Sequence, residues 1–219
     1  MTNEAFSVLS NLNKPPTGFE NLTFRDWCKL DEKVSQTVID QFASHCQHMQ
    51  ELQIDGFLLE SETDRKNMCD LVAKIFDSQA DNQMKRLEIY SFYNKEEMLE
   101  LADEDKTLID SIVRSGQTNL TNLHLYKNMT WWGDSEASEH LCTSIQNQTT
   151  LKELVLSHNT MSSSLTEQLL SAVLESASLA TIEVIYMINS ADFSSDRSCT
   201  LLMQLVDRAP VLKYCDIKD

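Results

Sequence analysis

A short apolar pattern recurs along most of this chain and constrains the fold more than any other feature. Two variable residues separate its first and second apolar positions, and one separates the second from the third. The copies are Phe19-x-x-Leu22-x-Phe24, Met49-x-x-Leu52-x-Ile54, Met84-x-x-Leu87-x-Ile89, Leu120-x-x-Leu123-x-Leu125, Leu151-x-x-Leu154-x-Leu156, Leu179-x-x-Ile182-x-Val184 and Leu212-x-x-Cys215-x-Ile217, with Val211-x-x-Tyr214 as an alternative for the last. The middle positions lie 30, 35, 36, 31, 28 and 33 residues apart, a regularity that indicates a repeat array.

Segments with helical periodicity fill the intervals between these short alternating runs. Their apolar positions are Val34, Val38, Phe42 and Cys46; Met68, Val72 and Phe76; Leu108, Ile109, Ile112 and Val113; Leu141 and Ile145; Leu165, Leu169, Leu170, Val173 and Leu174; and Leu201, Leu202, Leu205 and Val206. A capping box, Ser164-x-x-Glu167, is expected to open the fifth helix. Each unit is therefore one short strand and one helix, and the units must stack because neither element buries its apolar side alone.

Two copies of the pattern continue to an asparagine, giving Leu120-x-x-Leu123-x-Leu125-x-x-Asn128 and Leu151-x-x-Leu154-x-Leu156-x-x-Asn159. On these motifs the chain resembles the leucine-rich repeat family. Its unit of about 28 to 36 residues is similar to the ribonuclease-inhibitor-like subclass. The asparagine is expected to bond the backbone of the turn. Apolar packing should replace that bond where other residues take its position, namely Trp27, Phe57, Phe92 and Met187.

The resemblance covers residues 19–219, and residues 1–18 are expected to form a short N-terminal cap or tail. It implies an α/β solenoid, with a curved parallel sheet of about seven strands on the concave side and helices on the convex side. Seven strands would span roughly 29 Å, enough for a helix, a peptide or one face of a small domain. The last repeat should leave an apolar edge, covered by a partner, by a second copy or by further repeats.

Charge narrows the choice of partner. The chain has 34 acidic and 18 basic residues, a net charge of −16, and no cluster of lysine and arginine. Nucleic acids and acidic membrane surfaces are therefore disfavoured, whereas a basic protein surface would be attracted. A high negative charge is also common in proteins that use it only to stay in solution.

The pattern of apolar segments and the spacing of the cysteines indicate a reducing compartment. No run of apolar residues is long enough to span a membrane, and the first 25 residues lack a basic start followed by an apolar segment. The six cysteines are scattered without a C-x-x-C pair. We therefore expect a cytoplasmic protein with reduced thiols.

The sequence offers little support for catalysis. It contains only four glycines and lacks the motifs that bind phosphates, dinucleotides or catalytic zinc. The run His45-Cys46-Gln47-His48 has two possible ligands on one helix face but no second pair nearby. We expect no cofactor, no bound metal and no enzymatic activity.

Strand alternation predicts which side chains point away from the helices. Residues between the last two apolar positions are Thr23, Gln53, Glu88, His124, Val155 and Glu183. The residues just after them are Arg25, Asp55, Tyr90, Tyr126, Ser157 and Ile185, and the next are Asp26, Gly56, Ser91, Lys127, His158 and Tyr186. Stacked repeats place Tyr90 beside Tyr126. The candidate protein-binding residues there are Tyr90, Tyr126, His124, His158, Tyr186 and Glu88, although paired tyrosines can also serve stability alone.

Two further segments are candidate contact sites. Trp131 and Trp132 are adjacent in a polar loop, where two neighbouring indoles cannot both point into the core. The insertion over residues 94–106 carries Glu96, Glu97, Glu100, Asp103, Glu104 and Asp105. Its apolar residues are spaced so that a short acidic helix is plausible, either as a solvated face or as a site for a basic partner.

These features favour a non-catalytic protein-interaction module, serving as an adaptor, a scaffold or a complex subunit. Two alternatives remain open. One is a regulator of a small GTPase, similar to the acidic leucine-rich repeat activator of Ran, for which Arg25 is the concave arginine. The other is a substrate receptor of a ubiquitin ligase, although residues 1–18 are short for an adaptor-binding motif.

Overall fold

The computed structural model describes residues 20–24, 36–58, 62–79, 83–93, 120–126, 135–159, 161–188 and 191–217. Several predictions concern residues outside these ranges. They include the N-terminal cap at 1–18, Arg25, Asp26, Trp27, the 94–106 insertion, the helix predicted around residues 108–113, Lys127, Asn128, Trp131 and Trp132.

Within the described ranges, seven parallel strands form one sheet in the order in which they follow along the chain. The strands are β1 (Asn21–Phe24), β2 (Glu51–Leu58), β3 (Arg86–Tyr93), β4 (Asn122–Tyr126), β5 (Glu153–Val155), β6 (Val184–Tyr186) and β7 (Tyr214–Asp216). The helices are α2 (Gln36–Ser44), α3 (Glu62–Asp77), α6 (Ser135–Asn147), α7 (Ser163–Glu175) and α8 (Asp196–Arg208), with a 3-10 helix η1 (Ala177–Ala180). This α/β order, in which each strand pairs with the next, is compatible with a solenoid-like stack of units.

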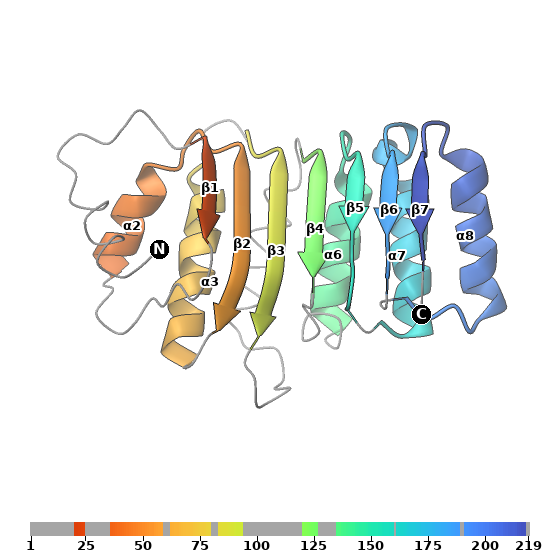
Figure 1. Ribbon diagram of the computed structural model, residues 1–219, viewed down its shortest axis with the longest axis horizontal. Coiled ribbons are helices and arrows are strands. Elements are labelled where there is room, and N and C mark those ends of the chain that lie inside the picture. Colours follow the sequence, from red (N-terminus) through yellow and green to blue (C-terminus); the bar gives the residue numbers. More distant parts are fainter. Residues whose placement is uncertain are drawn as a thin grey trace.

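The helices lie on one side of the sheet. In Figure 1, α3, α6 and α7 lie behind the strands, while α2 extends beyond β1 and α8 beyond β7. The row of helices is therefore wider than the row of strands. Neighbouring strands lie about 4.8 Å apart, whereas packed helices need about 8–10 Å, so a stack of such units bends with its strands on the inside. We call the helix-free side of the sheet the open face.

The core fills the space between the sheet and the helices. The middle positions of the repeat pair across neighbouring strands, and Leu52, Leu87, Leu123, Leu154 and Ile185 are fully buried. Helix residues such as Phe42, Ile75 and Leu169 close the core from the other side. The predicted apolar faces of α6 and α7 are buried, which confirms their periodicity, whereas Val206 of α8, also predicted to face the core, is 50% exposed.

The sixth repeat differs from the prediction by three residues. Ile185, not Ile182, pairs with Leu154, so this repeat reads Ile182-x-x-Ile185-x-Met187. Leu179, expected to begin the repeat, lies in η1. Ile185 therefore faces the core rather than outward, and Met187 is an apolar position rather than a substitute for the asparagine.

The corrected alignment makes the array more regular. The middle positions of the last three strands are then 31 and 30 residues apart, and Cys215 pairs with Ile185 as the first of the two C-terminal alternatives predicts. Glu183, expected to face outward from a strand, instead precedes β6, where its carboxylate lies 2.5 Å from Lys213 Nζ.

Polar contacts fix the ends of the units. α7 is capped by Ser162, whose Oγ accepts a hydrogen bond from the Leu165 amide, so the predicted capping box at Ser164 is wrong by two residues. Asn159 is fully buried, and its Nδ2 donates to the Leu125 carbonyl at 2.7 Å. This hydrogen bond therefore reaches β4 of the preceding repeat, rather than the backbone of the asparagine's own turn as predicted, and it ties this turn to that repeat.

Candidate functional site

Parallel pairing arranges the side chains of the open face in three rows that cross the strands. The first row contains Asn21, Glu51, Arg86, Asn122, Glu153, Val184 and Tyr214. The second contains Thr23, Gln53, Glu88, His124, Val155, Tyr186 and Asp216. The third contains Tyr90 and Tyr126, and it continues past the ends of β5 and β6 with Ser157 and Ile188.

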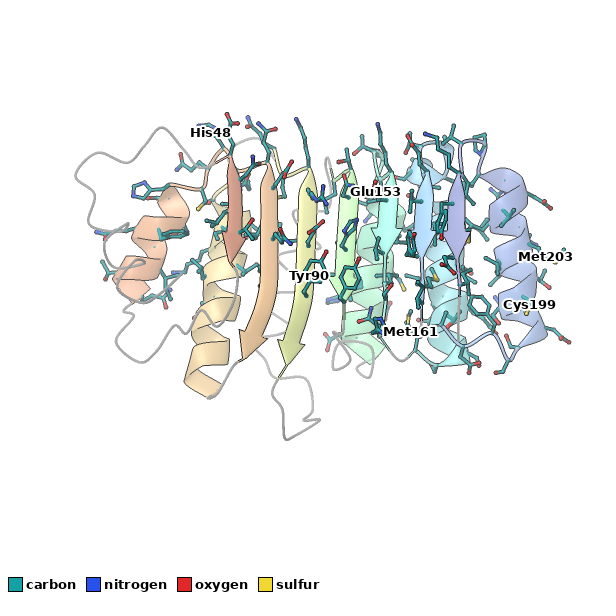
Figure 2. All side chains as sticks on the ribbon, in the orientation of Figure 1. His48, Tyr90, Glu153, Met161, Cys199 and Met203 are labelled. Atoms are coloured by element: carbon teal, nitrogen blue, oxygen red, sulfur yellow. The ribbon has the colours of Figure 1, made fainter. Side chains whose placement is uncertain are left out.

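The open face carries more acid than base. Its first two rows contain four acidic residues, Glu51, Glu88, Glu153 and Asp216, against the single basic residue Arg86. In Figure 2, Glu153 lies toward the amino ends of the strands and Tyr90 lies nearer to their carboxyl ends. The excess of carboxylates gives the open face a negative charge, like that of the chain as a whole.

Glu88 and His124 lie in the predicted row, but they are not exposed as predicted. Glu88 is 3% exposed and His124 is 7% exposed. Arg86 donates from Nε to Glu88 Oε1 at 2.7 Å, and the Tyr90 hydroxyl lies 3.4 Å from Glu88 Oε2. These longer neighbours cover the shorter carboxylate, so Glu88 lies beneath the surface of the open face.

His124 lies between two carboxylates. Its Nε2 is 3.2 Å from Glu153 Oε2, an oxygen that also accepts a hydrogen bond from Asn122 Nδ2 at 2.5 Å. Its Nδ1 is 3.0 Å from Glu88 Oε1, at an ion-pair distance but outside hydrogen-bond geometry. Burial lowers the pKa of His124 and outweighs Glu88 and Glu153, which raise it, so the imidazole is neutral at neutral pH.

This burial predicts acid sensitivity. Because the pKa of His124 is lower in the folded state, the unfolded chain binds the proton more readily once the pH falls below the ordinary histidine pKa of about 6.5. We expect the free energy of unfolding to decrease between pH 7.5 and 5.5, and to decrease less in His124→Gln. Urea denaturation of both proteins at several pH values measures this difference, and equal pH slopes would contradict the neutral buried imidazole.

Four tyrosines form two stacked pairs. Tyr90 stacks on Tyr126 with ring centroids 4.3 Å apart, which confirms that these residues are neighbours. Tyr186 stacks on Tyr214 at 4.8 Å, and the edge of His124 meets Tyr126 at 6.4 Å. Burial raises the pKa of Tyr90 and Tyr126, and the hydrogen bond with Tyr186 raises the pKa of Tyr214 to about 12. All three phenols therefore stay protonated at neutral pH.

A depression of about 460 Å³ runs along β5 between the two tyrosine pairs. It exists because β5 presents small side chains, Val155 and Ser157, between larger ones on β4 and β6. We call it the β5 trough. It is lined by His124, Tyr126, Glu153, Val155, Ser157, His158, Val184, Tyr186 and Ile188.

The trough brings together four of the predicted binding residues: His124, Tyr126, His158 and Tyr186. His158 is exposed at the rim, with a positive φ of 60° in the turn after β5. The sequence analysis missed Glu153, which a backward extension of the strand alternation would have found. The same extension would have found Tyr214, which precedes Cys215 on β7, whereas Val184 was missed because the sixth repeat was misaligned.

Two other surfaces of the described residues differ from the trough in their chemistry. A larger depression, about 790 Å³, lies on the helix side, where α6 and α7 meet and where Arg197 of α8 reaches it. Its lining is mainly serine, threonine, glutamine and glutamate, without an aromatic anchor among the lining residues. The second surface is apolar and lies at the C-terminal end of the sheet. Among the described residues, the exposed large apolar side chains are on α8, on β7 and between these elements: Met203, Val206, Val211 and Tyr214. This apolar end agrees with the expected edge of the array.

The described residues show no metal-binding geometry and no reactive buried thiol. No three His, Cys, Asp or Glu residues among them are grouped so that they could hold a metal ion. Burial raises the pKa of Cys46 to about 12. Burial, and to a lesser extent the charge of Glu139, raises the pKa of Cys142 to about 11, so both side chains remain thiols. In the same ranges, no helix is both long enough and apolar enough to cross a bilayer.

Comparison with known proteins adds no family: no protein-family model and no curated protein matches this chain. The fold and site together define a class, an α/β stack of strand–helix units with an acidic and aromatic open face. Function must therefore be inferred from the residues of this face.

Proposed function

We propose that this chain is a leucine-rich repeat protein, similar to the ribonuclease-inhibitor-like subclass, that binds another protein through the open face of its sheet. One observation carries this proposal. Two stacked tyrosine pairs flank a trough on a rigid parallel sheet. Aromatic side chains with a polar end, held around a concave site, are the groups that dominate protein-binding energy.

The repeat architecture supports the family part of the proposal. Middle apolar residues pair from strand to strand along the whole sheet. The buried Asn159 ties one repeat to the next through the Leu125 carbonyl. Such stacks present a continuous surface built from successive units, which suits an adaptor or a subunit of a larger complex.

Charge and thiols support the expected partner and compartment. The open-face carboxylates and the net charge of −16 favour a partner with a basic surface, because complementary fields speed encounter. Cys46, Cys142, Cys199 and Cys215 are free thiols, which is compatible with the cytoplasm. Met203 and Val206 on α8 provide a second, apolar surface where a partner or second copy could dock.

Affinity capture from a lysate of the source cells tests the proposed function. We expect the double variant Tyr126→Ala, Tyr186→Ala to recover the partner about tenfold less than the wild type, because it removes one ring from each stacked pair. A matched variant, Gln146→Ala with Gln168→Ala, changes exposed residues of α6 and α7 and should recover it fully. Circular dichroism and thermal melting establish that both variants are folded.

An unrelated acidic protein serves as a second bait, so that capture by charge alone is recognised. The proposal is wrong if the open-face variant retains the partner while the helix-face variant loses it. It is also wrong if the wild type captures no protein beyond those taken by the acidic bait.

A further inference from the structure

Aromatic rings from β4 and β6 form the side walls of the β5 trough. Tyr126 has Tyr90 on its β3 side, and Tyr186 has Tyr214 on its β7 side, so the remaining face of each ring is turned toward β5. β4 and β6 are two strand spacings apart, about 9–10 Å. Tyr186 faces His124 across Val155, and Tyr126 lies one row further along β4, so the two phenol rings are staggered along the trough. A flat group between two ring surfaces needs about 7 Å, so the trough has room for one such group between Tyr186 on β6 and the rings of β4.

The amino end of the trough is anionic. The side chain of Glu153 is 38% exposed, and its Oε2 is held in place by Asn122 and His124. A carboxylate accepts about four hydrogen bonds, so two neutral donors leave it able to bind a charged one. Arg86, the basic residue in the first two rows, lies two strands away and pairs with Glu88, which chiefly raises its pKa, with weaker charge interactions from Glu51 and Glu153.

The geometry points to an arginine side chain of the partner protein as the occupant of the β5 trough. This inference rests on the proposed function and adds the chemistry that the open face recognises. A guanidinium is planar, stacks on aromatic faces and matches a carboxylate with two parallel donors. Its methylene stem would lie against the aliphatic lining of Val155, Val184 and Ile188.

Charge complementarity favours this occupant over an apolar one. An apolar side chain would leave Glu153 facing a dry surface, whereas a guanidinium satisfies the carboxylate and also stacks on Tyr186 in the neighbouring row. A lysine ammonium carries the same charge but is a compact, strongly hydrated ion that cannot stack as a plane. We therefore expect arginine to bind more tightly than lysine.

Titration of the ¹⁵N-labelled 219-residue chain at low ionic strength tests the inference. The probes are N-acetyl-arginine methylamide, the lysine analogue and the citrulline analogue, which has the same shape as arginine without the charge. We expect the arginine probe to shift the amide signals of Val155, Ser157 and Tyr186, with a Kd on the order of 1–10 mM. Citrulline should bind about fivefold more weakly, and added salt should remove this difference.

Variants identify the groups that recognise the cation. Glu153→Gln keeps the shape of the side chain and should weaken arginine about fivefold, while leaving citrulline unchanged. Tyr186→Leu keeps apolar volume but removes one ring and should have a similar effect. Glu175→Gln on α7 is the matched change of charge and should have none. A dispersed amide spectrum shows that each variant is folded.

The outcomes separate this inference from the proposed function. Equal binding of citrulline and arginine, or equal effects of Glu153→Gln and Glu175→Gln, would overturn the arginine site. If the captured partner still depends on Tyr126 and Tyr186, the proposed function stands without it. If arginine binds the trough but capture is indifferent to those tyrosines, the proposed function fails instead.

Discussion

Met187→Ala is expected to lower the free energy of unfolding by about 3 kcal/mol. Met187 is 0% exposed and packs into the core between the sheet and the helices. Truncation removes its apolar contacts and leaves a cavity that the neighbouring repeats cannot fill without moving. Urea denaturation followed by circular dichroism measures the change, provided that the slope with denaturant stays the same.

Val184→Ala is the matched control for Met187→Ala. Val184 is partly exposed on the open face, so its truncation should cost about 1 kcal/mol or less. The pair tests the alignment of the sixth repeat directly, because the sequence pattern assigns Val184 to the core and the structure assigns Met187. A larger loss for Val184→Ala than for Met187→Ala would restore the sequence alignment.

The second large effect is expected at Asn159. Its Nδ2 donates to the Leu125 carbonyl in a fully buried setting. Asn159→Ala removes the donor, leaves the buried Leu125 carbonyl without this hydrogen bond and opens a small cavity. We therefore expect the free energy of unfolding to fall by about 2 kcal/mol. Thermal and urea unfolding both report the loss.

Asn147→Ala provides the comparison, since Asn147 is exposed at the end of α6 and its replacement should change stability by less than about 0.5 kcal/mol. If both variants were equally stable, the hydrogen bond between Asn159 and Leu125 of β4 would not hold the repeats together. The stack would then depend on apolar packing alone.

Prediction of the open face from sequence succeeded in part. Alternation along β3 and β4 correctly placed Tyr90 beside Tyr126, because every side chain in a parallel pair has a neighbour in register. It could not show that Glu88 and His124 are covered. Their exposure depends on how Arg86, Tyr90 and Tyr126 lie across them, and rotamers are set by packing rather than by pattern.

The trough also needed the tertiary structure. It depends on the contrast between small side chains on β5 and aromatic ones on β4 and β6, which requires the correct alignment of three strands. The sequence misaligned the third of these, because Ile182 and Ile185 are both apolar and both buried. A shift by three residues preserved most of the apolar pattern while moving Tyr186 and Val184 to the wrong rows.

What the sequence by itself determined is the repeat, and with it the parallel order of the strands and the placing of helices on one side. An apolar pattern at regular intervals has few other ways to bury its residues. Only the tertiary structure decided the alignment of the sixth repeat, the burial of Glu88 and His124, and the meeting of Glu153 with two tyrosine pairs. These features arise from contacts between repeats about 30 residues apart, and side-chain volume, not local pattern, decides which of those contacts form.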